Sequence, residues 1–189
     1  MKTTAINIRK GHVIEREDGK LYVILKAETI QPGKGAAVVQ IEMRDLKTGA
    51  KDNVRYRTQE TVEKAFIDSA EYQFLFAEDD QLTFMNTENY EQINVDSDLV
   101  GYPAVFLQEG MVVTIETYES TPVNVTLPDS VILEVTEAEP VVKGQTASSS
   151  YKPAIVENGE KVMVPPHIEA GTRIVVKTED GSYSERAKD

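Results

Sequence analysis

The chain is organised around Gln31-Pro32-Gly33-Lys34-Gly35-Ala36-Ala37, which separates two strand-like runs at residues 20–26 and 38–43. Proline presets φ for the second position of a turn, and glycine accepts a positive φ at the third. Residues 31–34 therefore predict a type II turn. The first run contains Leu, Tyr, Val and Ile and the second contains Val and Ile, which is a composition typical of strands. The segment is thus predicted to form the tip of a hairpin.

Lys34 has two interpretations at this tip. Gly33 and Gly35 lack Cβ atoms, so the backbone can approach another surface closely while the Lys34 side chain extends from it. Such a lysine could enter a narrow site or be modified by an enzyme. Alternatively, it is a solvated turn residue that keeps the hairpin soluble. A phosphate-binding P-loop is excluded, because Glu28 stands where that motif needs glycine and Gly35 stands where it needs Ser or Thr.

Composition predicts a cytoplasmic protein without cofactor or metal. The 189 residues are 40% hydrophobic and contain no cysteine, which excludes disulfides and thiol catalysis. No run approaches eighteen apolar residues, and the N-terminus has no apolar signal region, so neither a membrane span nor secretion is expected. The two histidines, His12 and His167, are not in a metal-ligand spacing. Without a recognisable catalytic motif, an enzyme is not expected.

The acidic residues that could suggest a site are better explained as solvated turns. Glu78-Asp79-Asp80 lies between two strand-like runs and has no apolar context that would raise one carboxyl pKa above its neighbour. The segment from Asp96 begins like a calcium loop. It fails at its fifth and twelfth positions, where Val100 and Leu107 stand in place of oxygen ligands. Neither segment predicts chemistry.

Charge is distributed very unevenly along the chain. The net charge of the whole is −12, yet residues 65–142 contain sixteen acidic residues and neither Lys nor Arg. Residues 1–64 have a net charge of +4, and residues 143–189 are neutral. An acidic middle segment cannot lie flat on a phosphate backbone, because like charges repel, but it could face a basic protein. Separate surfaces with separate partners are expected.

Short strands with intervening turns predict an all-β protein of small antiparallel barrels. We place the segments at 1–64, 65–128 and 129–189, with the first boundary after a polar stretch, residues 60–64, that lacks a strand pattern. One short helix is expected over residues 98–105, limited by Pro103. Arg55 and Arg57 share one strand face, which is either an RNA-facing stripe or a solvated face. Turns are expected at Asp18-Gly19, Lys47-Thr48-Gly49, Asn158-Gly159 and Asp180-Gly181.

Motifs along the whole chain resemble those of the bacterial elongation factor P family. Single pieces are weak, but their order and spacing over nearly all 189 residues are specific. The matching pieces are Pro32-Gly33-Lys34-Gly35-Ala36-Ala37, Tyr102-Pro103 with Val105-Phe106-Leu107, Lys143-Gly144 with Thr146-Ala147, Lys152-Pro153-Ala154, Val164-Pro165-Pro166 with Ile168, and Gly181-Ser182-Tyr183-Ser184-Glu185-Arg186-Ala187.

This resemblance implies an SH3-like barrel followed by two OB-type barrels in an elongated, L-shaped arrangement. It implies a monomeric, non-enzymatic translation factor that binds both ribosomal subunits next to the P-site tRNA and stimulates peptide-bond formation at consecutive prolines. Lys34 matches the tip residue of the family, which commonly carries a β-lysyl group added by a dedicated ligase. Pro32, Gly33 and Gly35 match the residues that support this tip.

The resemblance also implies nucleic-acid contacts at the C-terminal end. Gly144, Gln145 and Thr146 match a loop near the E-site codon of the mRNA, although many members have Asp in place of Gln145. An amide both donates and accepts hydrogen bonds, whereas a carboxylate only accepts. Tyr183 and Arg186 match residues near the tRNA anticodon stem, and the alternative is an ordinary last strand.

Two other functions remain open from the sequence. The acidic middle segment is compatible with a tandem-barrel adaptor that binds basic proteins, with Lys34 as a plain turn residue. A divergent paralogue that acts on other stalled ribosomes is the third possibility. Ribosome binding that depends on tRNA and salt would separate the adaptor from the translation factor.

Overall fold

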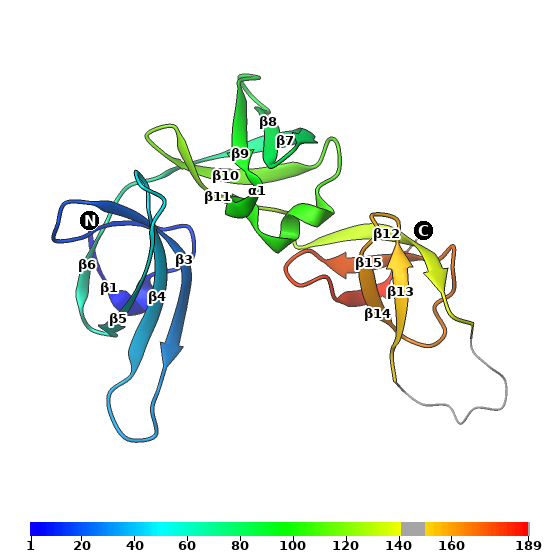
Figure 1. Cartoon of the computed structure of the whole chain (residues 1–189), viewed down its shortest axis with the longest axis horizontal. Helices are drawn as coiled ribbons and strands as arrows, with labels where there is room; N and C mark the ends of the chain where they lie inside the picture. The colour runs from blue at the N-terminus through cyan, green and yellow to red at the C-terminus, as the bar shows by residue number, and fades with distance from the viewer. Residues whose placement is uncertain (141–149, 189) are drawn as a thin grey trace. The chain divides into compact units, whose positions relative to one another are not determined.

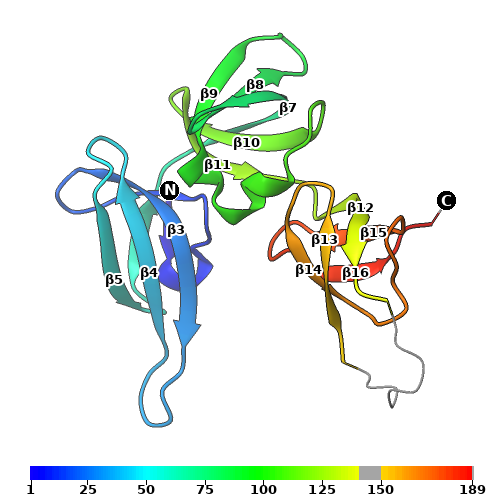
Figure 2. The same ribbon diagram turned by 45° about the vertical axis from the view of Figure 1, so that its right-hand side comes forward.

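The computed structural model describes residues 1–140 and 150–188. The chain divides into two compact units, one of Met1–Glu71 with Thr114–Val125 and the other of Tyr72–Val113 with Thr126–Asp189. The all-β prediction is confirmed, because three curled sheets contain almost all regular structure (Figure 1, Figure 2). No helix within the described residues is long and apolar enough to cross a membrane.

The first sheet has six strands in the order β1-β6-β2-β3-β4-β5. Alternate residues of β4 (Val39, Ile41 and Met43) are buried, because successive side chains of a strand point to opposite faces. They pack with buried residues of the other strands into one core. The elements are β1 (Lys2–Thr4), the 3₁₀ helix η1 (Ala5–Asn7), β2 (Val13–Glu15), β3 (Leu21–Ile30), β4 (Val38–Asp45), β5 (Lys51–Arg57) and β6 (Thr61–Lys64).

The predicted turns of the first sheet are confirmed. Gly19 follows Asp18 with a φ of 76°, and β2 pairs with β3 on either side of it. Gly49 has a φ of 75°, and its N–H donates to Asp45 O at 2.9 Å in the turn between β4 and β5. Glycine stands at both positions because other residues rarely adopt this left-handed backbone.

The prediction that residues 60–64 are not a strand is wrong. They contain β6, which pairs with β1 on one side and β2 on the other. Val62 is the only apolar residue of β6, and it is 7% exposed in the core. A four-residue strand with one inward apolar side chain has too little alternation to be recognised from sequence. The segment boundary after Lys64 stays a prediction.

The second sheet has five strands in the order β11-β10-β7-β8-β9. The single helix expected over residues 98–105 is instead two short helices, because Gly101 adopts a φ of 75° between them. Asp96 caps the first helix by accepting a hydrogen bond from the Asp98 N–H at 2.9 Å. The elements are β7 (Asp68–Glu78), β8 (Gln81–Asn86), β9 (Gln92–Asp96), α1 (Ser97–Val100), the 3₁₀ helix η2 (Tyr102–Phe106), β10 (Val112–Tyr118) and β11 (Thr121–Thr126).

The third sheet has five strands in the order β14-β13-β12-β15-β16. Its central strand buries Val131, Leu133 and Val135 in alternation, as a half-exposed strand requires. The predicted turns at Gly159 and Gly181 are confirmed, with φ values of 85° and 73°. The strands are β12 (Ser130–Ala138), β13 (Lys152–Val156), β14 (Lys161–Val164), β15 (Arg173–Lys177) and β16 (Tyr183–Arg186).

Candidate functional site

The hairpin of β3 and β4 carries Lys34 at its tip. The two strands pair from Tyr22 with Asp45 to Ile30 with Val38, and residues 31–37 connect their ends. Residues 31–36 are all exposed. Within the described residues, Lys34 makes no hydrogen bond or ion pair, so its ammonium group is free to meet an external partner. The hairpin prediction is confirmed.

The tip does not contain the predicted type II turn. That turn requires a φ near +80° at Gly33, but Gly33 is not among the residues with a positive φ, whereas Gly35 has a φ of 134°. The seven-residue connection reverses the chain over more residues than a four-residue turn, which moves the unusual backbone two positions along. A Cβ atom at Gly33 would meet nothing within 4 Å, and one at Gly35 would meet only Pro32 Cγ at 3.8 Å.

Two charged groups on or beside the hairpin have partners, in contrast to Lys34. Lys26 Nζ lies 3.1 Å from Glu28 Oε1 on β3. Arg55 Nε donates to Gln40 Oε1 at 3.2 Å, from β5 to β4. Arg55 and Arg57 are both exposed on β5, as predicted for one strand face, and both interpretations of that face stay open.

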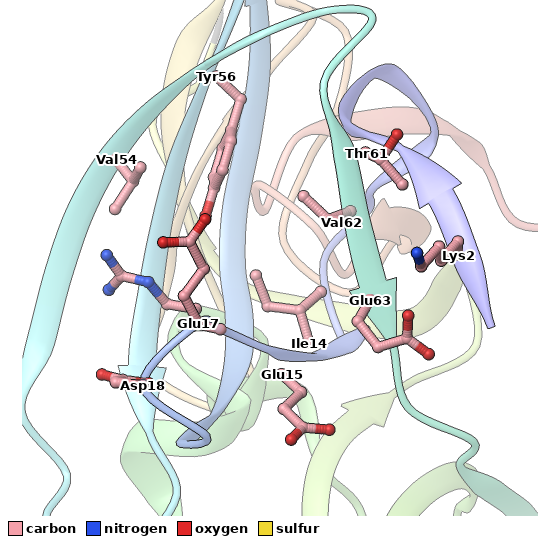
Figure 3. Close-up of a pocket in the computed structure, with 11 residues that line it drawn as sticks. Lys2, Ile14, Glu15, Glu17, Asp18, Val54, Tyr56, Thr61, Val62 and Glu63 are labelled. Carbon is pink, nitrogen blue, oxygen red and sulfur yellow. The ribbon is translucent and has the colours of Figure 1, made fainter.

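An open cleft of about 780 Å³ lies in the same sheet, between β5 and β6 (Figure 3). Figure 3 shows Val54 and Tyr56 on one side and Thr61, Val62 and Glu63 on the other. Its wall also includes carboxylates of the turn between β2 and β3. The remaining lining residues are Lys2, Ile14, Glu15, Arg16, Glu17 and Asp18.

Charges around this cleft are partly neutralised within the protein. Arg16 Nη1 lies 2.6 Å from Asp52 Oδ2, and the guanidinium stacks 5.0 Å from the centre of the Tyr22 ring. The hydrogen bond to Asp52 raises the pKa of Arg16. The N-terminal ammonium pairs with Glu63 at 2.8 Å. Burial raises the pKa of Tyr56. The two ion pairs join segments of the first sheet that are far apart in the sequence.

The candidate nucleic-acid contacts at the C-terminal end are only partly described. Tyr183 and Arg186 lie on β16, where a bulge lets Tyr183 pair with Val176 and Arg186 with Ile174. Because opposite residues of an antiparallel pair point to the same side, the bulge places Tyr183 and Arg186 on one face. Gly144, Gln145 and Thr146 lie outside the described residues.

Sequence reasoning missed Tyr151, which contacts Tyr183. The centres of the two rings are 6.3 Å apart, and the rings meet edge to face at 84°. Tyr151 is 52% exposed, so this aromatic pair is accessible from outside. An isolated tyrosine ahead of β13 gives no periodic signal, and only the fold brings it to β16.

His12 has a defined role that its sequence position did not reveal. Its Nδ1 accepts a hydrogen bond from the Arg9 N–H at 3.0 Å, which requires the neutral ring. Burial lowers the pKa of His12, and nearby Lys64 lowers it further. The folded protein therefore resists protonation more than the unfolded chain does.

We expect this histidine to make stability fall on mild acidification. Below the unfolded pKa of about 6.5, the unfolded state binds a proton that folded His12 binds only at lower pH. The free energy of unfolding in urea should therefore fall less between pH 7.5 and pH 5.5 in His12→Asn than in the wild type. The side-chain oxygen of this asparagine can replace Nδ1 as the acceptor. An equal loss of stability in both proteins would contradict the assignment of this pH dependence to His12. The carboxylates are common to both proteins, so they cannot cause a difference between them.

No group of three or more His, Asp or Glu residues in the described part of the chain is arranged to hold a metal ion. The arrangement instead supports recognition: an exposed cation on a long hairpin, and an aromatic pair that includes Tyr183 of β16. Neither feature by itself identifies a partner.

Comparisons with known proteins cover the whole chain. Three family models match: "Elongation factor P (EF-P) KOW-like domain" over residues 4–62, "Elongation factor P (EF-P) OB domain" over 67–125, and "Elongation factor P, C-terminal" over 131–186. Elongation factor P of Rhodospirillum centenum is 58% identical over 189 residues, which is all of both chains. The elongation factor P chains of Methylorubrum populi and Nitrobacter hamburgensis are 56% and 57% identical over the same full length.

A solved structure, eukaryotic translation initiation factor 5A from Methanococcus jannaschii, is 19% identical. It covers 66% of this chain and 95% of its own, with a TM-score of 0.37.

Proposed function

The chain belongs to the elongation factor P family of translation elongation factors, and on this premise we propose that it binds the ribosome beside the P-site tRNA and stimulates peptide-bond formation between consecutive prolines through Lys34. The observation that supports this most is the exposed Lys34 in the connection that follows a ten-residue strand, where it has no ion pair within the described residues. A cation held away from its own sheet is available to RNA phosphates and ribose hydroxyls.

The mechanism we propose is positioning, with the ribosome as the catalyst. Proline is a poor attacking amine and restricts the nascent chain, so the reacting groups are badly placed. A flexible cation beside the CCA end of the P-site tRNA would hold that end in productive geometry. Lysine suits this role, because its ammonium is a compact charge on a flexible stem.

We propose that Lys34 acts in a modified form, with a β-lysyl group attached by a ligase. The Nζ amine would attack an activated carboxyl, lose a proton and form an amide, while the activating group leaves. The product extends the side chain and ends in a new ammonium group. Exposure of residues 31–36 supports access by such an enzyme.

The rest of the chain is proposed to bind the ribosome as a monomer, in contact with both subunits in the cytoplasm. We divide it into barrels at residues 1–64, 65–128 and 129–189. Tyr183 and Arg186 are the proposed tRNA contacts, and Gly144, Gln145 and Thr146 the proposed contacts to the E-site codon. Because residues 65–142 lack Lys and Arg, we expect a basic protein rather than RNA next to them.

The charge of residues 65–142 also favours a second candidate, an acidic adaptor of basic proteins in which Lys34 has no role. Two measurements separate it from the translation factor. The intact mass of protein purified from its own host would reveal a group on Lys34. A reconstituted translation assay on a message with three consecutive prolines would reveal stimulation. A protein that carries no adduct and leaves the proline stall unchanged would contradict the proposed function.

The two glycines of the tip should respond differently to substitution. Gly35→Ala forces a residue with a Cβ atom into a φ of 134°, which L residues rarely adopt, so the tip backbone must change. Gly33→Ala introduces no such strain and meets no atom within 4 Å. We expect Gly35→Ala to reduce stimulation at consecutive prolines by about tenfold, because it displaces a positioned group modestly. Gly33→Ala should stay within about twofold of wild type. Equal activities would show that this backbone conformation is not needed.

A further inference from the structure

The first sheet is packed against β10 and β11 through a buried apolar cluster. Val13 of β2, Val23 of β3 and Val123 of β11 are at most 2% exposed and form the centre of this cluster. The backbone that leaves β6 also takes part, because the Ala65 N–H donates to Val13 O at 2.8 Å. The partly buried members are Leu21, Leu25, Leu46, Ala65, Ile67 and Tyr118.

A second contact closes this packing beside the apolar cluster. Gly11 has a φ of 90°, and a Cβ atom there would lie 2.8 Å from Asn124 Nδ2 and 2.9 Å from Asn124 Cγ. Asn124 is 7% exposed, and its Nδ2 donates to Glu116 Oε1 at 3.1 Å. The Gly11 backbone and the Asn124 side-chain amide therefore approach more closely than a residue with a Cβ atom would allow. We call Gly11, Val13, Val23, Val123 and Asn124 the junction.

Strand β3 connects the junction directly to the tip. Val23 lies in the junction and Ile30 ends the strand next to the tip, so roughly 23 Å of extended chain separates them. A rotation of about 10° at the junction would therefore move the tip by roughly 4 Å. Displacements much smaller than this are enough to slow a reaction that depends on positioning.

We propose that the junction holds the hairpin in a fixed orientation relative to β10 and β11, and that Val123 and Asn124 are positioning residues for Lys34. The proposal rests on the proposed function of Lys34 at the ribosome. The inclusion of residues 114–125 in the same compact unit as residues 1–71 supports it, as do the buried valines and the Gly11 contact. Contacts made by β10 and β11 then determine where the tip lies.

The test inserts one methyl group into the junction. Gly11→Ala places a Cβ atom against Asn124, whereas the control Gly19→Ala has a similar left-handed backbone, with a φ of 76°, and meets nothing within 4 Å. Asn124→Gly combined with Gly11→Ala removes the obstructing side chain. We expect Gly11→Ala to stimulate proline-proline bond formation at least about tenfold less than Gly19→Ala, and the double variant to recover part of that loss.

Two further measurements separate positioning from misfolding. The fraction of protein with an adduct on Lys34, from intact mass, should agree within about twofold between Gly11→Ala and Gly19→Ala, because modification needs only the tip. Nitrogen-15 relaxation should show the first sheet and residues 114–125 tumbling together in the wild type and separating in Gly11→Ala. Equal stimulation by the two alanine variants, or a parallel fall in adduct and stimulation, overturns the proposal.

The relaxation measurement also distinguishes this proposal from the proposed function. If Lys34→Ala stimulates as well as wild type, the role of Lys34 fails, yet relaxation still decides whether the junction is rigid. If the first sheet and residues 114–125 tumble independently in the wild type, the junction proposal fails even when Lys34 is essential.

Discussion

A Lys34→Ala variant is expected to lose about 100-fold in its stimulation of proline-proline bond formation, with its fold intact. The loss follows because the only proposed contact with the reacting tRNA end is made by this side chain, and misplacement of one positioning group can cost a factor of this size. Stability should change by less than about 0.5 kcal/mol, since Lys34 is exposed and has no ion pair with any described residue. The rate of proline-proline bond formation and the free energy of unfolding in urea are to be measured on the same preparations.

Two other variants identify what Lys34 contributes. Lys34→Arg keeps the positive charge but offers no amine for acylation, so it should stimulate less than modified wild type and more than Lys34→Ala. Lys26→Ala removes an exposed lysine of the same hairpin, one already paired with Glu28 at 3.1 Å, and should stay within about twofold of wild type. Full stimulation by Lys34→Ala would leave the hairpin without its proposed role.

The hairpin could be predicted because its signals are local. Two apolar runs and a segment with proline and two glycines were enough to find β3, β4 and the tip between them. The detailed backbone of the tip was not predictable in the same way. Sequence rules for a four-residue turn assigned the positive φ to Gly33, whereas the longer connection places it at Gly35.

The features that sequence missed depend on residues far apart in the chain. β6 has one buried apolar residue, Val62, and is a strand because β1 and β2 pair with it on both sides. The sequence contains no signal that Gly11 and Asn124 meet, because 112 positions (residues 12–123) separate them and only the fold brings them together. Tertiary contacts override weak local preferences in such places. The tip could therefore be found from sequence, whereas the contacts that orient it could not.

A comparable close approach occurs in the other unit, where Gly181 lies against η2. A Cβ atom at Gly181 would overlap Tyr102 Oη and would lie 3.3 Å from Phe106 Cζ. The Tyr102 ring packs edge to face on Phe106 at 5.6 Å, and Phe106 is 1% exposed, so a shift of Tyr102 would disturb this aromatic contact. The Asn158 Nδ2 donates to Val105 O at 2.9 Å, which adds a second contact between η2 and the third sheet. Gly181 therefore permits η2 to pack on that sheet.

Gly181→Ala is expected to destabilise this unit by about 2 kcal/mol, roughly half from the left-handed backbone and half from displaced aromatic rings. Gly159→Ala is the matched control: its φ is 85°, but its Cβ atom would meet nothing within 4 Å, so only the backbone cost of about 1 kcal/mol applies. Tyr102→Phe removes the overlapping oxygen, so the double variant should recover part of the difference in urea unfolding. If Gly181→Ala and Gly159→Ala lose the same stability, the aromatic contact does not hold η2 in place, because backbone strain alone would then account for both.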